Sequence, residues 1–125
     1  MHQVIKTKNA PEAIGPYVQA IKAGNFIFTA GQVPLSPVSG VMVEGGVREQ
    51  TVQVIENLKA IIEAGGGTLS SIMKTTVYLT KPDDFTVMNE IYSKYFALNP
   101  PARTTVFISA LPKGALVEID AIAAL

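Results

Sequence analysis

The chain has 125 residues, with ten basic and ten acidic side chains, no cysteine and one histidine, His2. This length suits a single domain over residues 1–125, and the lack of cysteine excludes disulfides, thiolate catalysis and cysteine-based metal sites. Zero net charge argues against nucleic acid or an anionic membrane as the main partner, and a metal site or catalytic triad built on histidine would depend on His2 alone.

The N-terminal stretch MHQVIKTKNAPE has no apolar segment of the kind found in signal peptides. No apolar run approaches the roughly 20 residues that span a bilayer, so we expect a cytoplasmic protein. Charged residues make up 16% of the chain, whereas about 25% is typical of soluble domains. This low share of charge predicts that other copies of the chain cover part of the surface.

Three strands are predicted in the first third of the chain, at residues 2–6, 17–22 and 26–30. The second and third form a hairpin, because only residues 23–25, which include a glycine, separate them. The Pro/Gly-rich stretch at 32–46 is expected to be a loop.

The next segment, Val47 to Ala64, is predicted to be a helix, because apolar residues recur every three or four positions. Three glycines, residues 65–67, are expected to end it as a C-terminal cap. A phosphate-binding loop is a weaker interpretation, since the glycines follow a helix and lack the GKS/T sequence. The polar residues expected on the solvent side are Gln50, Gln53, Asn57, Lys59 and Glu63.

Residues 72–80 are predicted to form a strand, and a helix is expected over 85–97, with an aspartate of Pro82-Asp83-Asp84 as its N-cap. Two further strands follow at 103–109 and 116–124. The order β-β-β-α-β-α-β-β predicts an α+β fold, in which both helices pack on one face of a mixed sheet.

Alternation along the last two strands suggests how their side chains divide between the faces of the sheet. Val117 and Ile119 belong to an apolar row that suits the helices, which leaves Glu118 on the opposite face. We expect Arg103, with Thr105 and Phe107, to share that face with Glu118. A face of this mixed character suits a subunit interface, with the charged pair lining a cleft between copies.

Two readings remain open for each of these charged residues. Arg103 is either a surface arginine or a clamp for a carboxylate, which a planar guanidinium binds through two parallel hydrogen bonds. Glu118 is either the partner of Arg103 in a structural ion pair or a general acid/base whose pKa burial raises. Composition and spacing lead to a possible carboxylate-binding cleft, and to no particular reaction.

Several ordered motifs resemble one known family, the RidA (YjgF-type) enamine/imine deaminases, over nearly the whole chain. The motifs are residues 9–20, 28–34, 74–79 and 84–89, and ProAlaArg at 101–103 followed by Glu118-Ile119. The resemblance implies a homotrimer with a chorismate-mutase-like α+β fold and active sites in clefts between subunits. It implies hydrolysis of 2-aminoacrylate-type enamines and 2-imino acids to 2-oxo acids and ammonia, without a metal or organic cofactor.

Carried over from the family, Arg103 would grip the substrate carboxylate, and Glu118 would orient the attacking water with help from the backbone carbonyl of Thr105. The residues that the resemblance places around the substrate are Tyr17, Ala30, Gly31, Phe85 and Asn89. Ala30 stands where many deaminating members have serine, and Thr104-Thr105 stands where Ser-Cys or similar pairs are common. We expect these two departures from the family pattern to affect the substrate preference or the reaction rate, and not the fold.

A non-catalytic role is the alternative function: a trimer that senses a small 2-oxo acid, or that binds proteins in a chaperone-like role. A sensor of carboxylates needs Arg103 but not Glu118, so the pair discriminates between the two functions.

Overall fold

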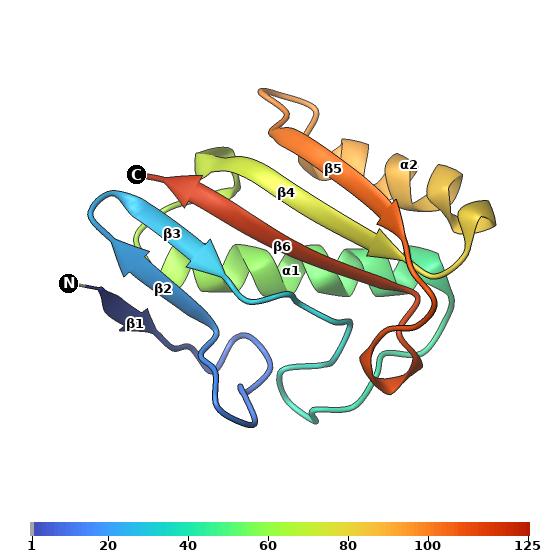
Figure 1. Cartoon of the computed structure of the whole chain (residues 1–125), viewed down its shortest axis with the longest axis horizontal. Helices are drawn as coiled ribbons and strands as arrows, with labels where there is room; N and C mark the ends of the chain where they lie inside the picture. The colour runs from blue at the N-terminus through green and yellow to red at the C-terminus, as the bar shows by residue number, and fades with distance from the viewer. Residues whose placement is uncertain (1) are drawn as a thin grey trace.

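The computed structural model of the chain describes residues 2–125, which form one mixed six-stranded sheet with both α-helices on the same side (Figure 1). The sheet order is β1-β2-β3-β6-β4-β5; β4 and β5 pair in parallel, and the other neighbours are antiparallel. This arrangement confirms the predicted α+β class and the predicted element order. The elements are β1 (Gln3–Ile5), β2 (Ala20–Ala23), β3 (Phe26–Thr29), α1 (Val47–Ala64), β4 (Ile72–Leu79), α2 (Phe85–Tyr95), β5 (Ala102–Phe107) and β6 (Val117–Ala124).

The second predicted strand begins later than expected, at Ala20, so Tyr17 lies in the loop before it. Gly15 has a φ of 115°, and the Tyr17 N–H donates to the Gly15 carbonyl at 2.9 Å. A glycine with positive φ followed by proline keeps this segment in a turn.

The apolar stripe of α1 is buried as predicted, with Val54, Leu58 and Ile61 fully buried against the sheet and α2. The expectation that Gln50 and Asn57 face solvent is wrong, since they are only 6% and 1% exposed. Both amides bond to loops that flank the helix. A buried amide is tolerated when such bonds satisfy it, and helical periodicity does not reveal where a loop will cover the helix.

The two helices begin and end differently from one another. Glycine ends α1 as predicted: Gly66 has a φ of 98°, its N–H donates to Glu63, and the Gly67 N–H donates to Ile62. These are the paired bonds of a glycine C-terminal cap. A short 3₁₀ turn, Pro82–Asp84, precedes α2. Asp84 takes the N-cap position, but its side chain makes no capping hydrogen bond.

Within residues 2–125, no helix has the length and apolar character needed to cross a membrane.

The register of β4 with its two neighbours decides which face of the sheet each functional candidate occupies. Arg103 on β5 lies opposite Thr75 on β4, and Thr75 is fully buried beneath α2, where its hydroxyl hydrogen-bonds that of Tyr92 at 2.7 Å. Arg103 therefore lies on the face covered by the helices, which we call the helix face. Glu118 lies opposite Tyr78, on the uncovered face of the sheet, which we call the open face.

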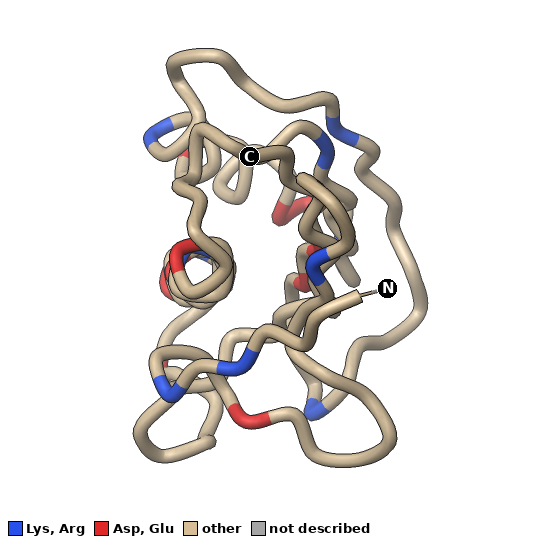
Figure 2. The backbone as a smooth tube through the Cα atoms, turned by 90° about the vertical axis from the view of Figure 1, so that its left-hand side faces the viewer, with Lys and Arg blue, Asp and Glu red and all other residues tan. Residues whose placement is uncertain are grey.

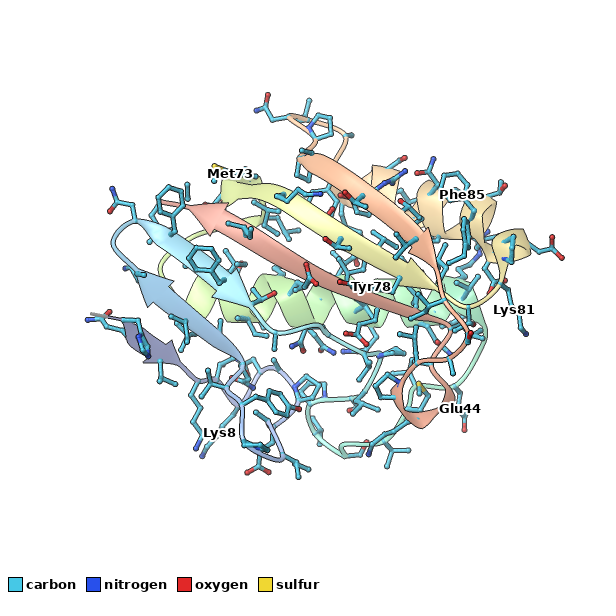
Figure 3. All side chains as sticks on the ribbon, viewed as in Figure 1. Lys8, Glu44, Met73, Tyr78, Lys81 and Phe85 are labelled. Atoms are coloured by element: carbon cyan, nitrogen blue, oxygen red, sulfur yellow. The ribbon has the colours of Figure 1, made fainter. Side chains whose placement is uncertain are left out.

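The prediction that Arg103, Thr105 and Phe107 share a face with Glu118 is therefore wrong. Figure 3 shows Tyr78 on the face toward the viewer, whereas Phe85 lies with α2 behind the sheet. Alternation assigns residues to rows within one strand, but only the pairing of strands decides which row of one strand aligns with which row of the next. All six residues of β5 are exposed or half-buried, so no buried apolar row in this strand fixes the alignment.

Candidate active site

Residues of α2 hold Arg103 on the helix face at the edge of the sheet. Its Nη1 donates a 2.7 Å hydrogen bond to Oδ1 of Asn89. Its Cζ lies 4.7 Å from the ring centroid of Tyr92 and 5.7 Å from that of Phe85. Aromatic faces attract a guanidinium, and burial raises the pKa of Tyr92, so this tyrosine is a neutral neighbour. The side chain of Arg103 is thus oriented without being neutralised.

The charge of Arg103 is not balanced by a carboxylate within residues 2–125. In contrast, the exposed Arg48 on α1 pairs with Glu90 on α2 at 3.2 Å. A guanidinium has five N–H donors in a planar fork, and Asn89 accepts from only one of its nitrogens. The arrangement leaves donors for a planar anion such as a carboxylate.

The backbone beside Arg103 adds polar groups at the free edge of the sheet. The Ile108 N–H donates to the Leu79 carbonyl of β4 at 2.9 Å. Backbone groups of alternate residues point to opposite sides of a strand, so Thr105, three residues earlier, directs its N–H and C=O away from β4. Because β5 is the last strand of the sheet, the Thr105 carbonyl is available to a ligand or to a water molecule.

Glu118 forms a second cluster on the open face, apart from Arg103. It is half-buried, and Tyr78 lies opposite it on β4. The hydroxyl of Tyr78 donates to Oδ2 of Asp120 at 3.1 Å. Burial, and second the neighbouring Asp120 carboxylate, raise the pKa of Glu118 above its usual value. A carboxyl group with a raised pKa is suited to exchange protons with a substrate near neutral pH.

Gly31 lies against the Glu118 side chain, and a Cβ at this position would collide with Oε2. The backbone around it is fixed on both sides: the Ala30 N–H donates to the Gln19 carbonyl at 2.8 Å, and Gln32 exchanges two backbone hydrogen bonds with Ile119. Gly31 is therefore required for the close approach of backbone and carboxyl group, which leaves backbone polar groups beside Glu118.

Tyr17 is 54% exposed and belongs to neither cluster. It lines a cavity of about 730 Å³ between the N-terminal strand and the loop that follows it, together with Lys6, Lys8 and Glu12. Neither Arg103 nor Glu118 lines this cavity.

The predicted residues thus fall into two groups within one chain. Arg103, Asn89, Phe85 and Thr105 lie together at the β5 edge as a candidate anion-binding group, and Glu118, Gly31 and Ala30 lie on the open face as a candidate acid/base group. Sequence reasoning missed Thr75 and Tyr92 as supports of Arg103. Strand alternation did place Tyr78 and Asp120 on the face of Glu118, but it did not reveal the hydrogen bond between them. Asn89, a polar residue on an apolar helical stripe, was the one signal in the sequence that pointed to the first group.

Residues 2–125 contain no cluster of three His, Cys, Asp or Glu side chains placed to hold a metal ion.

The chain is similar to proteins of one family along nearly its whole length. A family model described as "Endoribonuclease L-PSP" matches residues 7–125. A RutC family protein of Pyrococcus horikoshii is 55% identical over 98% of each chain. The human 2-iminobutanoate/2-iminopropanoate deaminase is 44% identical over 98% of this chain and 90% of that protein. The crystal structure of RidA from an Antarctic Psychrobacter matches with a TM-score of 0.95 at 43% identity, over 98% of this chain and 99% of the other.

A match of this extent in both sequence and structure also agrees with the motifs noted in the sequence. The chain therefore belongs to the RidA (YjgF-type) family.

Proposed function

We propose that this protein is a 2-iminobutanoate/2-iminopropanoate deaminase, which hydrolyses reactive 2-imino acids and their enamine tautomers to 2-oxo acids and ammonia. The observation that carries the proposal is Arg103: a half-buried guanidinium, oriented by Asn89 and two aromatic rings, that no carboxylate within residues 2–125 neutralises. Such a group suits the carboxylate that all these substrates carry. The human relative, named for this activity, supports the assignment.

In the proposed reaction, Arg103 holds the carboxylate and fixes the position of the C=N bond. An enamine substrate first takes a proton on its terminal carbon and becomes the imine. Glu118 removes a proton from water as the water oxygen bonds to the imine carbon, and the C=N electrons move to nitrogen. Glu118 returns this proton to the nitrogen, which gives an intermediate with a hydroxyl and an amino group on the same carbon. Glu118 then passes the hydroxyl proton to the nitrogen, so the C–N bond breaks and ammonia leaves as the C=O bond forms. Positioning of the substrate by Arg103 and the raised pKa of Glu118 support this chemistry.

Arg103 and Glu118 face opposite sides of one chain, so we propose that each site combines Arg103 of one copy with Glu118 of another. The open face carries exposed apolar side chains, with Val4 57%, Phe26 45% and Phe28 46% exposed, which suits contact between copies. We propose a homotrimer, as the family resemblance implies. Light scattering on the purified protein should give the mass of three chains, and a monomer would contradict the shared site.

The direct test of the reaction generates 2-aminoacrylate in the cuvette with a serine dehydratase and follows pyruvate. The wild type should accelerate pyruvate formation, Arg103→Ala should abolish the acceleration, and Glu118→Ala should reduce it strongly with folding retained. Arg48→Ala is the matched control, because this arginine is exposed and paired with Glu90, and it should behave as the wild type. Full activity of Glu118→Ala would refute the water-positioning role.

The same experiment distinguishes the non-catalytic alternative. A protein that binds 2-oxo acids through Arg103 but does not accelerate pyruvate formation is a sensor and not a deaminase. Ribonuclease activity, which the description of the family model names, finds little support in the charges. Ten basic and ten acidic residues cancel, and the two signs are interspersed along the backbone (Figure 2).

A further inference from the structure

A row of side chains on the helix face of β5 leads from a charged end to an apolar end. Arg103, Thr105 and Phe107 alternate along the strand and therefore share this face. Phe85, the first residue of α2, connects the two ends. Its ring centroid lies 5.7 Å from Cζ of Arg103 and 6.5 Å from the ring centroid of Phe107, with the two rings tilted by 57°. The cation and the aromatic pair form one continuous surface.

Phe107 is 47% exposed although it packs against Phe85. It lies on the opposite side of the sheet from Phe26 and Phe28, so it is not part of the apolar open face proposed for contact between copies. Thr105, which is half-buried, lies between Arg103 and Phe107 on the strand and has a smaller side chain than either. An exposed aromatic wall that continues from an unpaired guanidinium suits a ligand with a carboxylate at one end and an apolar group at the other.

We propose that Phe85 and Phe107 form the wall of a pocket that selects imino acids with apolar side chains of three or more carbons, such as those derived from leucine, methionine or phenylalanine. The inference rests on the proposed function, because Arg103 must hold the substrate carboxylate. Four residues of a strand span roughly 13 Å. A methyl or ethyl group on an acid bound to Arg103 stays beside Phe85, whereas a longer side chain reaches toward Phe107.

The test compares deamination of short and long imino acids, generated in solution by a flavin amino-acid oxidase from 2-aminobutyrate and from leucine. The rate of imine loss is measured by competition with semicarbazide. The wild type should give the higher kcat/KM with the leucine-derived imine. Phe107→Ala should lower kcat/KM for that substrate by about tenfold or more and change the short substrate little, since loss of several apolar contacts affects only the longer chain.

Leu98→Ala is the control, because Leu98 is 86% exposed after α2 and should leave both substrates unaffected. An unchanged ratio of the two kcat/KM values in Phe107→Ala would overturn the inference. So would a change in the oligomeric mass of Phe107→Ala by light scattering, because Phe107 would then be a contact between copies.

Calorimetric binding of 2-oxobutanoate and 4-methyl-2-oxopentanoate separates this inference from the proposed function. Selective weakening of the longer acid by Phe107→Ala, in a protein that deaminates neither imine, would support the pocket and refute the deaminase. Deamination of both imines with equal binding of the two oxo acids would support the deaminase and refute the pocket.

Discussion

Arg103 is a cation whose orientation depends on uncharged neighbours. The amide of Asn89 and the rings of Phe85 and Tyr92 fix its direction, and none of them removes its charge. A carboxylate partner in the same place would satisfy the guanidinium and compete with a substrate. The hydroxyl pair of Thr75 and Tyr92 extends this support into the core, so the anchor rests on a rigid part of the fold.

Gly31→Ala tests at the same scale whether the position of Glu118 matters. The new Cβ would collide with the Glu118 carboxyl group, which lies at the end of a flexible side chain and can move aside. We expect a folded protein whose kcat/KM falls by up to about a hundredfold, because small misplacements of a catalytic group are costly. Gly46→Ala is the control, since nothing lies within 4 Å of a Cβ there and its φ is −103°. Wild-type kinetics in Gly31→Ala would show that Glu118 need not occupy this position.

Glu118 should also make stability depend on pH. Burial and Asp120 raise its pKa in the folded chain above the value of 4.5 expected for an unperturbed glutamate. The contribution of Glu118 to the free energy of unfolding is therefore most favourable below pH 4.5, where its carboxyl group is protonated. This contribution is lost as the pH rises through the raised pKa of the folded chain. Glu118→Gln should accordingly have a higher Tm than the wild type at pH 7, and the difference should shrink as the pH falls toward 4.5. Glu44→Gln, at an exposed loop position, is the control in thermal unfolding. Equal or lower stability of Glu118→Gln at pH 7 would contradict this sign.

At the scale of elements, the sequence allowed the helices and strands to be predicted, but not the way in which loops and strands align with them. The stripe of α1, its glycine end and the last strand follow local periodicity, which short-range sterics determine. Asn57 and Arg103 were misplaced because their surroundings come from distant segments. The carbonyls of the 32–46 loop surround Asn57, and the pairing of β4 with β5 turns Arg103 toward α2.

Asn57→Leu tests the role of that amide in holding the loop to α1. Nδ2 of Asn57 donates to the Val33 and Leu35 carbonyls at 3.3 and 3.1 Å. Leucine of similar size would remove both bonds, and only the Val33 carbonyl would keep a partner, the Leu35 N–H at 2.8 Å. We expect a loss of about 1–3 kcal/mol in the free energy of unfolding, measured by chemical denaturation. Glu63→Leu, at an exposed position on the same helix, should change stability far less. Equal effects of the two substitutions would mean that the loop does not depend on Asn57.

At the scale of the whole molecule, one chain places Arg103 and Glu118 on opposite faces of its sheet. The predicted pairing of Arg103 with Glu118 survives only as a proposal about different copies. Low charge and an apolar sheet face were visible in the sequence as signs of association. The symmetry of such an association could not be predicted from the sequence, because no local pattern encodes the relative placement of subunits. Repetition of one head-to-tail contact around a ring would complete every site in the same way.

Mixing two inactive variants tests this shared site most directly. Arg103→Ala and Glu118→Gln chains are each purified, unfolded together in equal amounts and refolded, and deamination of 2-aminoacrylate is measured. In a mixed trimer, one of the three sites combines an intact Arg103 with an intact Glu118. Random assembly should therefore restore roughly a quarter of the wild-type activity. Each variant refolded alone should remain inactive. No recovery in the mixture, with mixed trimers verified by mass, would contradict a site built from two copies.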